Sequence, residues 1–310
     1  MGRANIAVRQ GSRAMRDSDV EVLFDARAQL GEGPCWDKER RALYWVDIVG
    51  GTVHAYEPDT GKQKSVGMST YVSSIVPRKS GNAVVTLQHG FYDLDFETGK
   101  VSPIAEVEKD LADNRFNDGK CDALGRFWAG TMNMRGTRPT GALYCLEENH
   151  SLRKMLSNVT TSNGPAWSPD NRIMFYTDTH TKKVSAFDYD LTSGRIRNRR
   201  IVIDLSAQSS SPDGMAVDEE GMIWLAQWGG SRISRWNPST KETIDQVMIP
   251  ASQVTSCCFG GKNFDELYIT TARMGLHEKE LSQQPHSGGL FRARVKVRGL
   301  CANYFDGQKP

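Results

Sequence analysis

Polar residues with oxygen-bearing side chains recur at one position of a repeated sequence pattern, just before apolar residues. They are Glu32 in LGEGP, Ser73 and Ser74 in YVSSIVP, Asn117 in RFNDGK, Asn163 in SNGPAW, Asp213 in SPDGMAV and Ser256 in TSCCFGG. Carboxylate and carboxamide oxygens suit hard or borderline divalent cations. A cation held by Glu32, Asn163 and Asp213 would keep open positions for water and substrate, as a catalytic metal requires. NDG, SNG and PDG are also turn signatures, but their shared position in the repeat favours a site.

The segment SPDGMAVDEEGMIWLAQW, residues 211–228, contains a second acidic group with a different interpretation. Asp213 lies at the start of the first strand of its repeat. Asp218 begins the turn that precedes the second strand in every repeat. The pattern therefore predicts a solvated turn at Asp218, where replacement by alanine would cost little stability, typically within about 0.5 kcal/mol.

Short β-rich runs supply the elements that must position these residues. Six runs resemble one another: LYWVD from Leu43, AVVTL from Ala83, FWAGT from Phe127, MFYTD from Met174, IWLAQ from Ile223 and LYITT from Leu267. Successive runs start 40 to 49 residues apart, a period that a four-stranded propeller blade needs. Turns flank each run, and another short strand follows most of them. The sequence therefore predicts an all-β protein, a six-bladed β-propeller formed as one domain by residues 20–310.

The propeller explains how residues so far apart in sequence could share a site. The first strand of each blade lines the central channel, so six equivalent positions converge on one axis. VEVLFDA, residues 20–26, precedes the first repeat and is predicted to close the ring by pairing with the last blade. Residues 1–19 lack the apolar stretch of a secretory signal and are predicted to be a disordered lead.

Composition excludes several classes of function. With 38% hydrophobic and 25% charged residues and a net charge of +2, the chain has an ordinary globular composition. No stretch of about 18 apolar residues is present, so no membrane span is expected. RIRNRR, residues 195–200, has no interleaved aromatic residues, which favours a surface hairpin over a nucleic-acid site.

The six cysteines form no C-x-x-C pair, which favours core thiols in a reducing, cytoplasmic setting. G-x-S-x-G and P-loop motifs are absent.

Six blocks occur in an order and at a spacing that resemble a known family, from about Glu21 to the end of the chain. They are LGEGPCWD, NRFNDGKCDALGRFWAGTM, SNGPAWSPD, FDYDLTSGRIRNRR, PDGMAVDEEGMIWLAQW and TSCCFGGKNFDELYITTA. The family they resemble is the SMP-30/gluconolactonase/luciferin-regenerating family. The resemblance implies a six-bladed propeller with one divalent metal in its channel.

The resemblance also implies roles for individual residues. Glu32, Asn163 and Asp213 match the metal ligands. Asp213 also matches the proposed proton donor or acceptor, and Arg115 and Asn117 match positions that contact substrate. One departure concerns the segment GTMNMRG, because Arg135 stands where the animal members have a glutamate that contacts substrate. Substrate preference is therefore not carried over from the family.

These observations lead to a metal-dependent sugar lactone hydrolase as the expected function. The alternatives are a non-enzymatic calcium-binding regulatory protein and a related organophosphate hydrolase. Ca²⁺ and Zn²⁺ lead the expected metals, and Mn²⁺, Mg²⁺ and Fe²⁺ also suit oxygen ligands. The expected partner is a small-molecule sugar lactone, with no nucleic acid and no membrane, and the expected state is a monomer or weak homo-oligomer.

Overall fold

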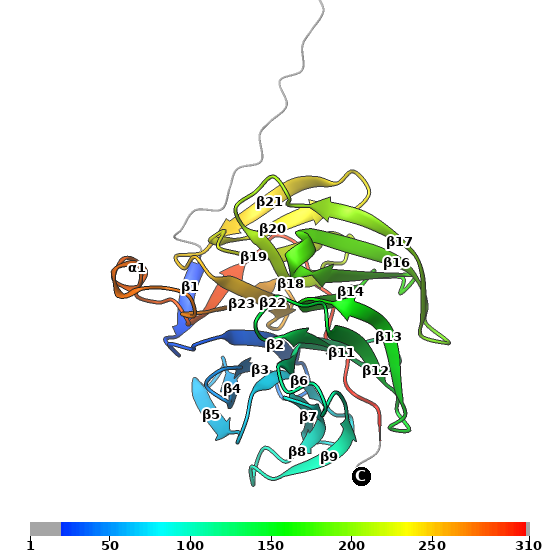
Figure 1. Cartoon of the computed structure of the whole chain (residues 1–310). Coiled ribbons are helices and arrows are strands. Elements are labelled where there is room, and N and C mark those ends of the chain that lie inside the picture. The colour runs from blue at the N-terminus through cyan, green and yellow to red at the C-terminus, as the bar shows by residue number, and fades with distance from the viewer. Residues whose placement is uncertain (1–19, 308–310) are drawn as a thin grey trace, which may run out of the picture.

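Residues 20–307 are described by the structure, a computed structural model of the chain, and they form six small antiparallel sheets arranged around a common axis (Figure 1). Each sheet has four strands. The predicted six-bladed β-propeller is therefore confirmed. The expectation for residues 1–19 concerns a segment outside the described residues.

The blades follow one another along the chain. The first three contain β2 (Gly31–Asp37), β3 (Ala42–Asp47), β4 (Thr52–Glu57) and β5 (Lys62–Gly67); β6 (Val72–Pro77), β7 (Ala83–Leu87), β8 (Gly90–Leu94) and β9 (Val101–Glu106); and β10 (Asn114–Cys121), β11 (Phe127–Asn133), β12 (Gly141–Leu146) and β13 (Leu152–Val159). The next two contain β14 (Ser162–Trp167), β15 (Ile173–Asp178), β16 (Lys183–Asp190) and β17 (Arg195–Asp204); and β18 (Ser211–Val217), β19 (Ile223–Trp228), β20 (Arg232–Asn237) and β21 (Glu242–Met248).

The sixth blade joins the two ends of the chain. It contains β22 (Val254–Gly260), β23 (Glu266–Thr271), β24 (Leu290–Arg294) and, as its outer strand, β1 (Val20–Phe24). β1 pairs antiparallel with β24, with Val20 opposite Ala293. The predicted closure of the ring is confirmed, and it leaves no blade with its fourth strand missing.

The first strand of each blade lies nearest the axis. β2 contacts β6 and β22, and the contacts continue through β10, β14 and β18 to complete a ring. These strands are almost entirely buried, whereas outer strands such as β5, β9 and β17 are largely exposed. RIRNRR falls on β17, so its expected surface location is confirmed.

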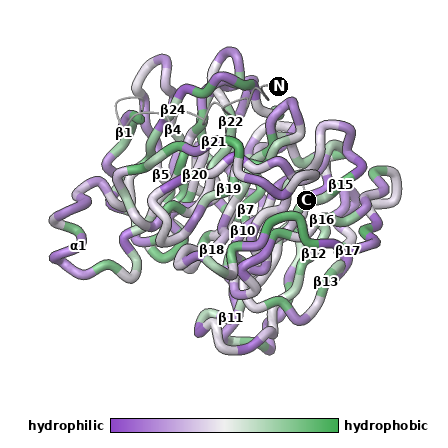
Figure 2. The backbone as a smooth tube through the Cα atoms, turned by 90° about the horizontal axis from the view of Figure 1, so that it is seen from above, coloured by the Kyte–Doolittle hydropathy of each residue, from purple (hydrophilic) through white to green (hydrophobic). Residues whose placement is uncertain are grey.

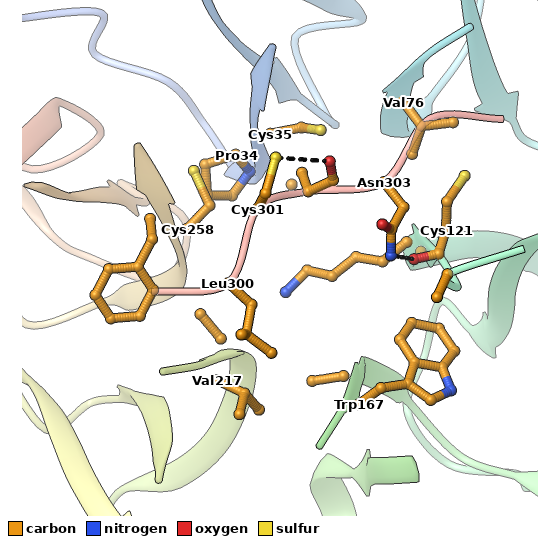
Figure 3. A pocket seen from close by; sticks show the side chains of 18 of the residues that line it. Pro34, Cys35, Val76, Cys121, Trp167, Val217, Cys258, Leu300, Cys301 and Asn303 are labelled. Carbon is orange, nitrogen blue, oxygen red and sulfur yellow. Dashed lines mark hydrogen bonds between the residues drawn. The ribbon is translucent and has the colours of Figure 1, made fainter. Parts of the chain in front are cut away.

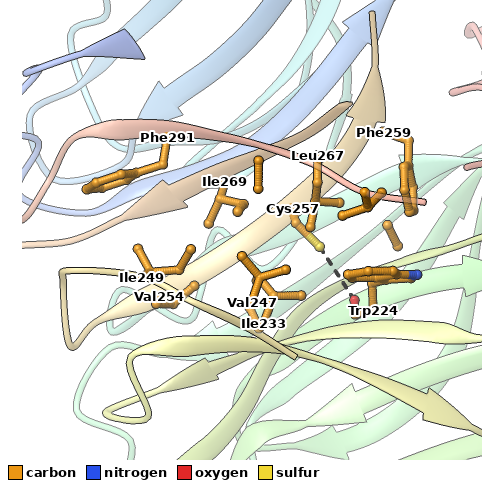
Figure 4. Close-up of a cluster of buried hydrophobic side chains, with 14 of the residues drawn as sticks. Trp224, Ile233, Val247, Ile249, Val254, Cys257, Phe259, Leu267, Ile269 and Phe291 are labelled. Carbon is orange, nitrogen blue, oxygen red and sulfur yellow. Dashed lines mark hydrogen bonds between the residues drawn. The ribbon is translucent and has the colours of Figure 1, made fainter. Parts of the chain in front are cut away.

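Hydrophobic clusters lie between neighbouring blades. Figure 4 shows the cluster between the fifth and sixth blades, in which Trp224 and Ile233 face Phe259 and Leu267. Comparable clusters occupy the other five junctions of the ring. Packing of sheet against sheet, at about 25 cal/mol per Å² of apolar surface, thus holds the ring together.

Each innermost strand contains a β-bulge at its polar position. The register shifts lie between Glu32 and Cys35, Val72 and Ser74, Phe116 and Asp118, Asn163 and Ala166, Pro212 and Met215, and Val254 and Ser256. A bulge bends the strand and changes the direction of its side chains. In two of the bulges Gly33 and Gly164 have φ of +55° and +75°, where a residue with a side chain would be strained.

The prediction of a solvated turn at Asp218 is wrong. Asp218 does begin the expected turn, but its side chain is fully buried. Its carboxylate accepts hydrogen bonds from two backbone amides of the turn, from Trp224 Nε1 at 2.9 Å and from Arg235 Nε at 2.7 Å. Asp122 accepts a similar bond from Trp128 Nε1 at 3.0 Å. An aspartate six residues before a tryptophan is therefore the signal that sequence reasoning missed.

Two further observations concern the described residues. All six cysteines have free thiols; five are buried, which confirms their expected place in the core, whereas Cys301 is only partly buried. Within residues 20–307 no helix is both long and apolar enough to cross a membrane. α1 (Glu278–Gln283) is short and projects from the edge of the molecule in both views (Figures 1 and 2).

Candidate functional site

One cavity of about 390 Å³ at the axis is lined by all five residues singled out from the sequence. They are Glu32, Arg115, Asn117, Asn163 and Asp213. These residues come from four different blades, and each is no more than 6% exposed. The structure therefore brings the expected ligands and the expected substrate contacts into one small volume.

The serines at the same repeat position are used differently. Ser73 Oγ donates to Phe116 O at 2.5 Å, and Ser74 Oγ pairs with Thr86 Oγ1 at 2.6 Å. Ser256 is fully buried and packs against Gly214. A Cβ atom added to Gly214 would lie 2.2 Å from the hydroxyl oxygen of Ser256. These hydroxyls pack the inner strands together and do not line the cavity.

The two carboxylates share a buried environment. Burial raises the pKa of Glu32 well above its usual range, and repulsion from Asp213 and Asp118 adds to that increase. Burial likewise raises the pKa of Asp213, again reinforced by Asp118. Arg115 opposes both shifts, and burial lowers the pKa of its own guanidinium to about 10. The site therefore places two carboxyl groups where water solvates their charged forms poorly, so the metal-free protein favours their protonated forms.

The oxygen atoms of this group fit a divalent cation. Asp213 Oδ1 is buried and has no hydrogen-bond partner among the described residues. Glu32 Oε2 accepts a bond from the amide of Gly33 at 3.0 Å. Burying carboxylates without compensation is costly, and a cation would offset that cost at both residues. Within residues 20–307 no three His, Cys, Asp or Glu side chains are grouped as metal ligands, whereas the expected set includes the carboxamide of Asn163.

The carboxamides of Asn117 and Asn163 are tied to each other. Asn117 Nδ2 donates to Asn163 Oδ1 at 3.0 Å and to Ser162 O at 2.8 Å. Arg115 NH1 donates to Asn117 Oδ1 at 2.8 Å. Asn117 thus uses both the NH₂ group and the oxygen of its carboxamide within the protein, and one lone pair of Oδ1 stays available to another donor.

Sequence reasoning missed Asp118, which does not line the cavity but raises the pKa of both Glu32 and Asp213. Asp118 is 1% exposed, and its Oδ2 has no partner among the described residues. Adjacent side chains normally point to opposite faces of a strand, so Asn117 and Asp118 would not be expected to share one environment. The bulge in β10 breaks that alternation. A bulge is not visible in the apolar pattern, so no signal in the sequence identified Asp118.

The mouth of the cavity is formed partly by η2 (Thr179–Thr181), which follows β15. His180 lines the cavity and contacts Thr161 Oγ1 through Nδ1 at 3.1 Å. Arg135 does not line it; its exposed guanidinium lies 3.4 Å from Asp113. His180 and Lys182, and not Arg135, are therefore the basic side chains of this turn that line the cavity.

A second cavity of about 260 Å³ lies further along the same inner strands (Figure 3). Its walls include Pro34, Cys35, Cys121 and Val217, and the C-terminal segment with Leu300–Asn303 crosses it. No carboxylate lines this cavity. The chemistry expected from the sequence therefore belongs to the first cavity.

Comparison with known proteins gives consistent matches over nearly the whole chain. The family profile described as "SMP-30/Gluconolactonase/LRE-like region" matches residues 30–273. Regucalcin of Gallus gallus is 42% identical over 300 residues, which cover 94% of this chain and 100% of that protein. A Bacillus subtilis protein whose name proposes a sugar lactone lactonase is 39% identical over 290 residues, which cover 93% and 99%. The solved structure of a calcium-binding protein, regucalcin from Agrobacterium tumefaciens, is similar with a TM-score of 0.88 and 25% identity, covering 92% and 96%.

Proposed function

Because the chain belongs to the SMP-30/gluconolactonase/LRE-like family, we propose that it is a metal-dependent lactonase that opens a sugar lactone to the aldonic acid. The observation that carries the proposal is the convergence of Glu32, Asn163, Asp213 and Arg115 on one buried cavity. The name of the Bacillus subtilis relative supports the same class of substrate.

Glu32, Asn163 and Asp213 would hold one divalent cation, with Ca²⁺ or Zn²⁺ favoured over Mn²⁺, Mg²⁺ and Fe²⁺. When bound, such a cation polarises the carbonyl group of an ester and stabilises negative charge on its oxygen. The two buried carboxylates offer the charge that a dication requires, and the carboxamide oxygen adds a neutral ligand. Calcium is supported by the name of the Agrobacterium tumefaciens structure.

Asp213 would move the proton in the reaction. Its Oδ1 has no partner within the described residues, so it is free to accept a proton from the water that attacks the lactone carbonyl carbon. As the ring C–O bond breaks, the same carboxyl group returns the proton to the departing alkoxide oxygen. A carboxyl group whose pKa is raised by burial holds this proton better than an exposed one.

Arg115 and Asn117 would orient the sugar. The Arg115 guanidinium uses NH1 for Phe116 O and Asn117 Oδ1, and the rest of its five N–H donors can serve sugar hydroxyls. Asn117 Oδ1 retains one lone pair, which can accept from a hydroxyl. Both side chains are held before substrate binds, so little ordering is required on binding.

Hydrolysis of a panel of sugar lactones, including glucono-1,5-lactone, tests the proposal. We expect hydrolysis above the spontaneous rate, its loss with a chelator, and its recovery with added divalent cation. The proposal is abandoned if the metal-loaded protein hydrolyses none of the lactones. A parallel phosphotriester assay tests a related organophosphate hydrolase.

A second candidate function is calcium binding without catalysis, and it is favoured by the description of the Agrobacterium tumefaciens structure as a calcium-binding protein. The same ligands would serve it, but a proton acceptor and an arginine beside them would have no role. Calcium binding in calorimetry together with no turnover of any lactone would support this second candidate.

A further inference from the structure

A directional chain of hydrogen bonds crosses the cavity from the third blade to the fifth. Arg115 NH1 donates to Asn117 Oδ1 at 2.8 Å, and Asn117 Nδ2 donates to Asn163 Oδ1 at 3.0 Å. Asn163 Nδ2 then donates to Thr179 Oγ1 at 2.7 Å. Thr179 Oγ1 donates to Pro212 O at 3.0 Å, next to Asp213. The chain therefore links the expected ligand Asn163 to the backbone beside Asp213, through a residue outside the expected ligand set.

The chemistry of the two ends fixes the direction of every bond in the chain. A guanidinium only donates hydrogen bonds, and a backbone carbonyl only accepts them. Because Thr179 gives its hydrogen to Pro212 O, its oxygen must accept from Asn163, so the nitrogen of that carboxamide faces Thr179. A flipped Asn163 would place its nitrogen against Asn117 Nδ2, which is also a donor. The carboxamide of Asn163 thus has one favoured orientation.

We propose that Thr179 is a positioning residue that holds the carboxamide oxygen of Asn163 toward the cation, an inference that rests on the proposed metal-dependent function. The backbone of Thr179 is itself held, because its amide donates to Thr161 O at 3.0 Å. Asn163 Oδ1 accepts one bond from Asn117 and keeps a second lone pair for the metal. Hydrogen bonds behind metal ligands commonly account for 10- to 100-fold in metal affinity.

Calorimetric titration of the metal-free protein with Ca²⁺, and separately with Zn²⁺, tests this role without an activity measurement. We expect Thr179→Val, which removes the hydroxyl at nearly constant volume, to weaken binding of the cation that binds the wild type by about 10-fold or more. Thr179→Ser keeps a hydroxyl at this position, so its metal affinity should remain within about 3-fold of the wild type.

Thr181→Val is the matched control on the same short turn. Thr181 Oγ1 donates to Asp178 O at 2.7 Å and does not contact Asn163, so metal affinity should stay within about 3-fold of the wild type. Urea unfolding of each metal-free variant verifies that the fold is retained. Unchanged affinity in a folded Thr179→Val, or an equal loss in Thr181→Val, would overturn this inference alone. A wild type that binds neither of these cations, and none of Mn²⁺, Mg²⁺ and Fe²⁺, would overturn the proposed metal dependence as well.

Discussion

The buried carboxylate of Asp218 provides a sharp test of how the blades are held. Replacing Asp218 by alanine removes the acceptor for two backbone amides of its turn, at 2.9 and 3.0 Å. It also leaves the indole N–H of Trp224, a residue only 1% exposed, without its partner. Arg235 loses a salt bridge of 2.7 Å to a carboxylate that is fully buried.

These losses add to a large change in the free energy of unfolding. Arg235 keeps a partial compensation, because it also pairs with the exposed carboxylate of Glu220 at 2.6 Å. An unpaired buried donor costs about 1–3 kcal/mol, and breaking a buried ion pair costs about 3–5 kcal/mol. We therefore expect Asp218→Ala to lower stability by about 3–5 kcal/mol, a large share of the 5–15 kcal/mol typical of a domain.

Urea unfolding in the presence of chelator, followed by tryptophan fluorescence and circular dichroism, measures this change. Glu219→Ala is the matched control, because Glu219 is the exposed neighbour on the same turn, and it should shift stability by no more than about 0.5 kcal/mol. If Asp218→Ala loses less than about 1 kcal/mol, or no more than Glu219→Ala, the carboxylate does not stabilise the turn as inferred from its contacts.

The remaining predictions concern the cavity. Asp213→Asn should lower kcat for lactone hydrolysis by about 10²- to 10⁴-fold even at saturating metal. In Asn163→Ala, by contrast, added metal should recover much of the lost rate. If the rate of Asp213→Asn reaches the wild-type plateau as metal is added, Asp213 acts only as a metal ligand. Divalent cation should raise the melting temperature of chelated protein by mass action, and no rise at saturating cation would contradict the site. The raised pKa values of Glu32 and Asp213 mean that the folded state holds protons that the unfolded chain releases above about pH 4. Metal-free protein should therefore lose stability as pH rises through the folded-state pKa values of these two groups. The double variant Glu32→Gln/Asp213→Asn should lose less stability over the same pH range. If urea unfolding shows the same dependence of stability on pH in both proteins, this explanation is contradicted.

The sequence alone determined the architecture, because a propeller repeats one local pattern. Runs such as LYWVD from Leu43 and IWLAQ from Ile223 recur at a period that fits four strands. β1 was identified as the closing strand because VEVLFDA precedes the first repeat and has no partner within it. Residues at equal positions in such repeats must meet at the axis, so the cavity with Glu32, Asn163 and Asp213 followed from register.

Only the tertiary structure decided which polar groups are buried and what they contact. Asp218 has the local signature of a solvated turn, but Trp224 and Arg235, on neighbouring strands of the same blade, donate to it and exclude water. Asp118, beside a bulge, acts on the pKa values of Glu32 and Asp213, and Thr179 contacts Asn163, which lies 16 residues earlier in the chain. Turn residues and alternation are local properties of the chain, whereas the burial and pairing of a charge depend on atoms that the fold brings from elsewhere.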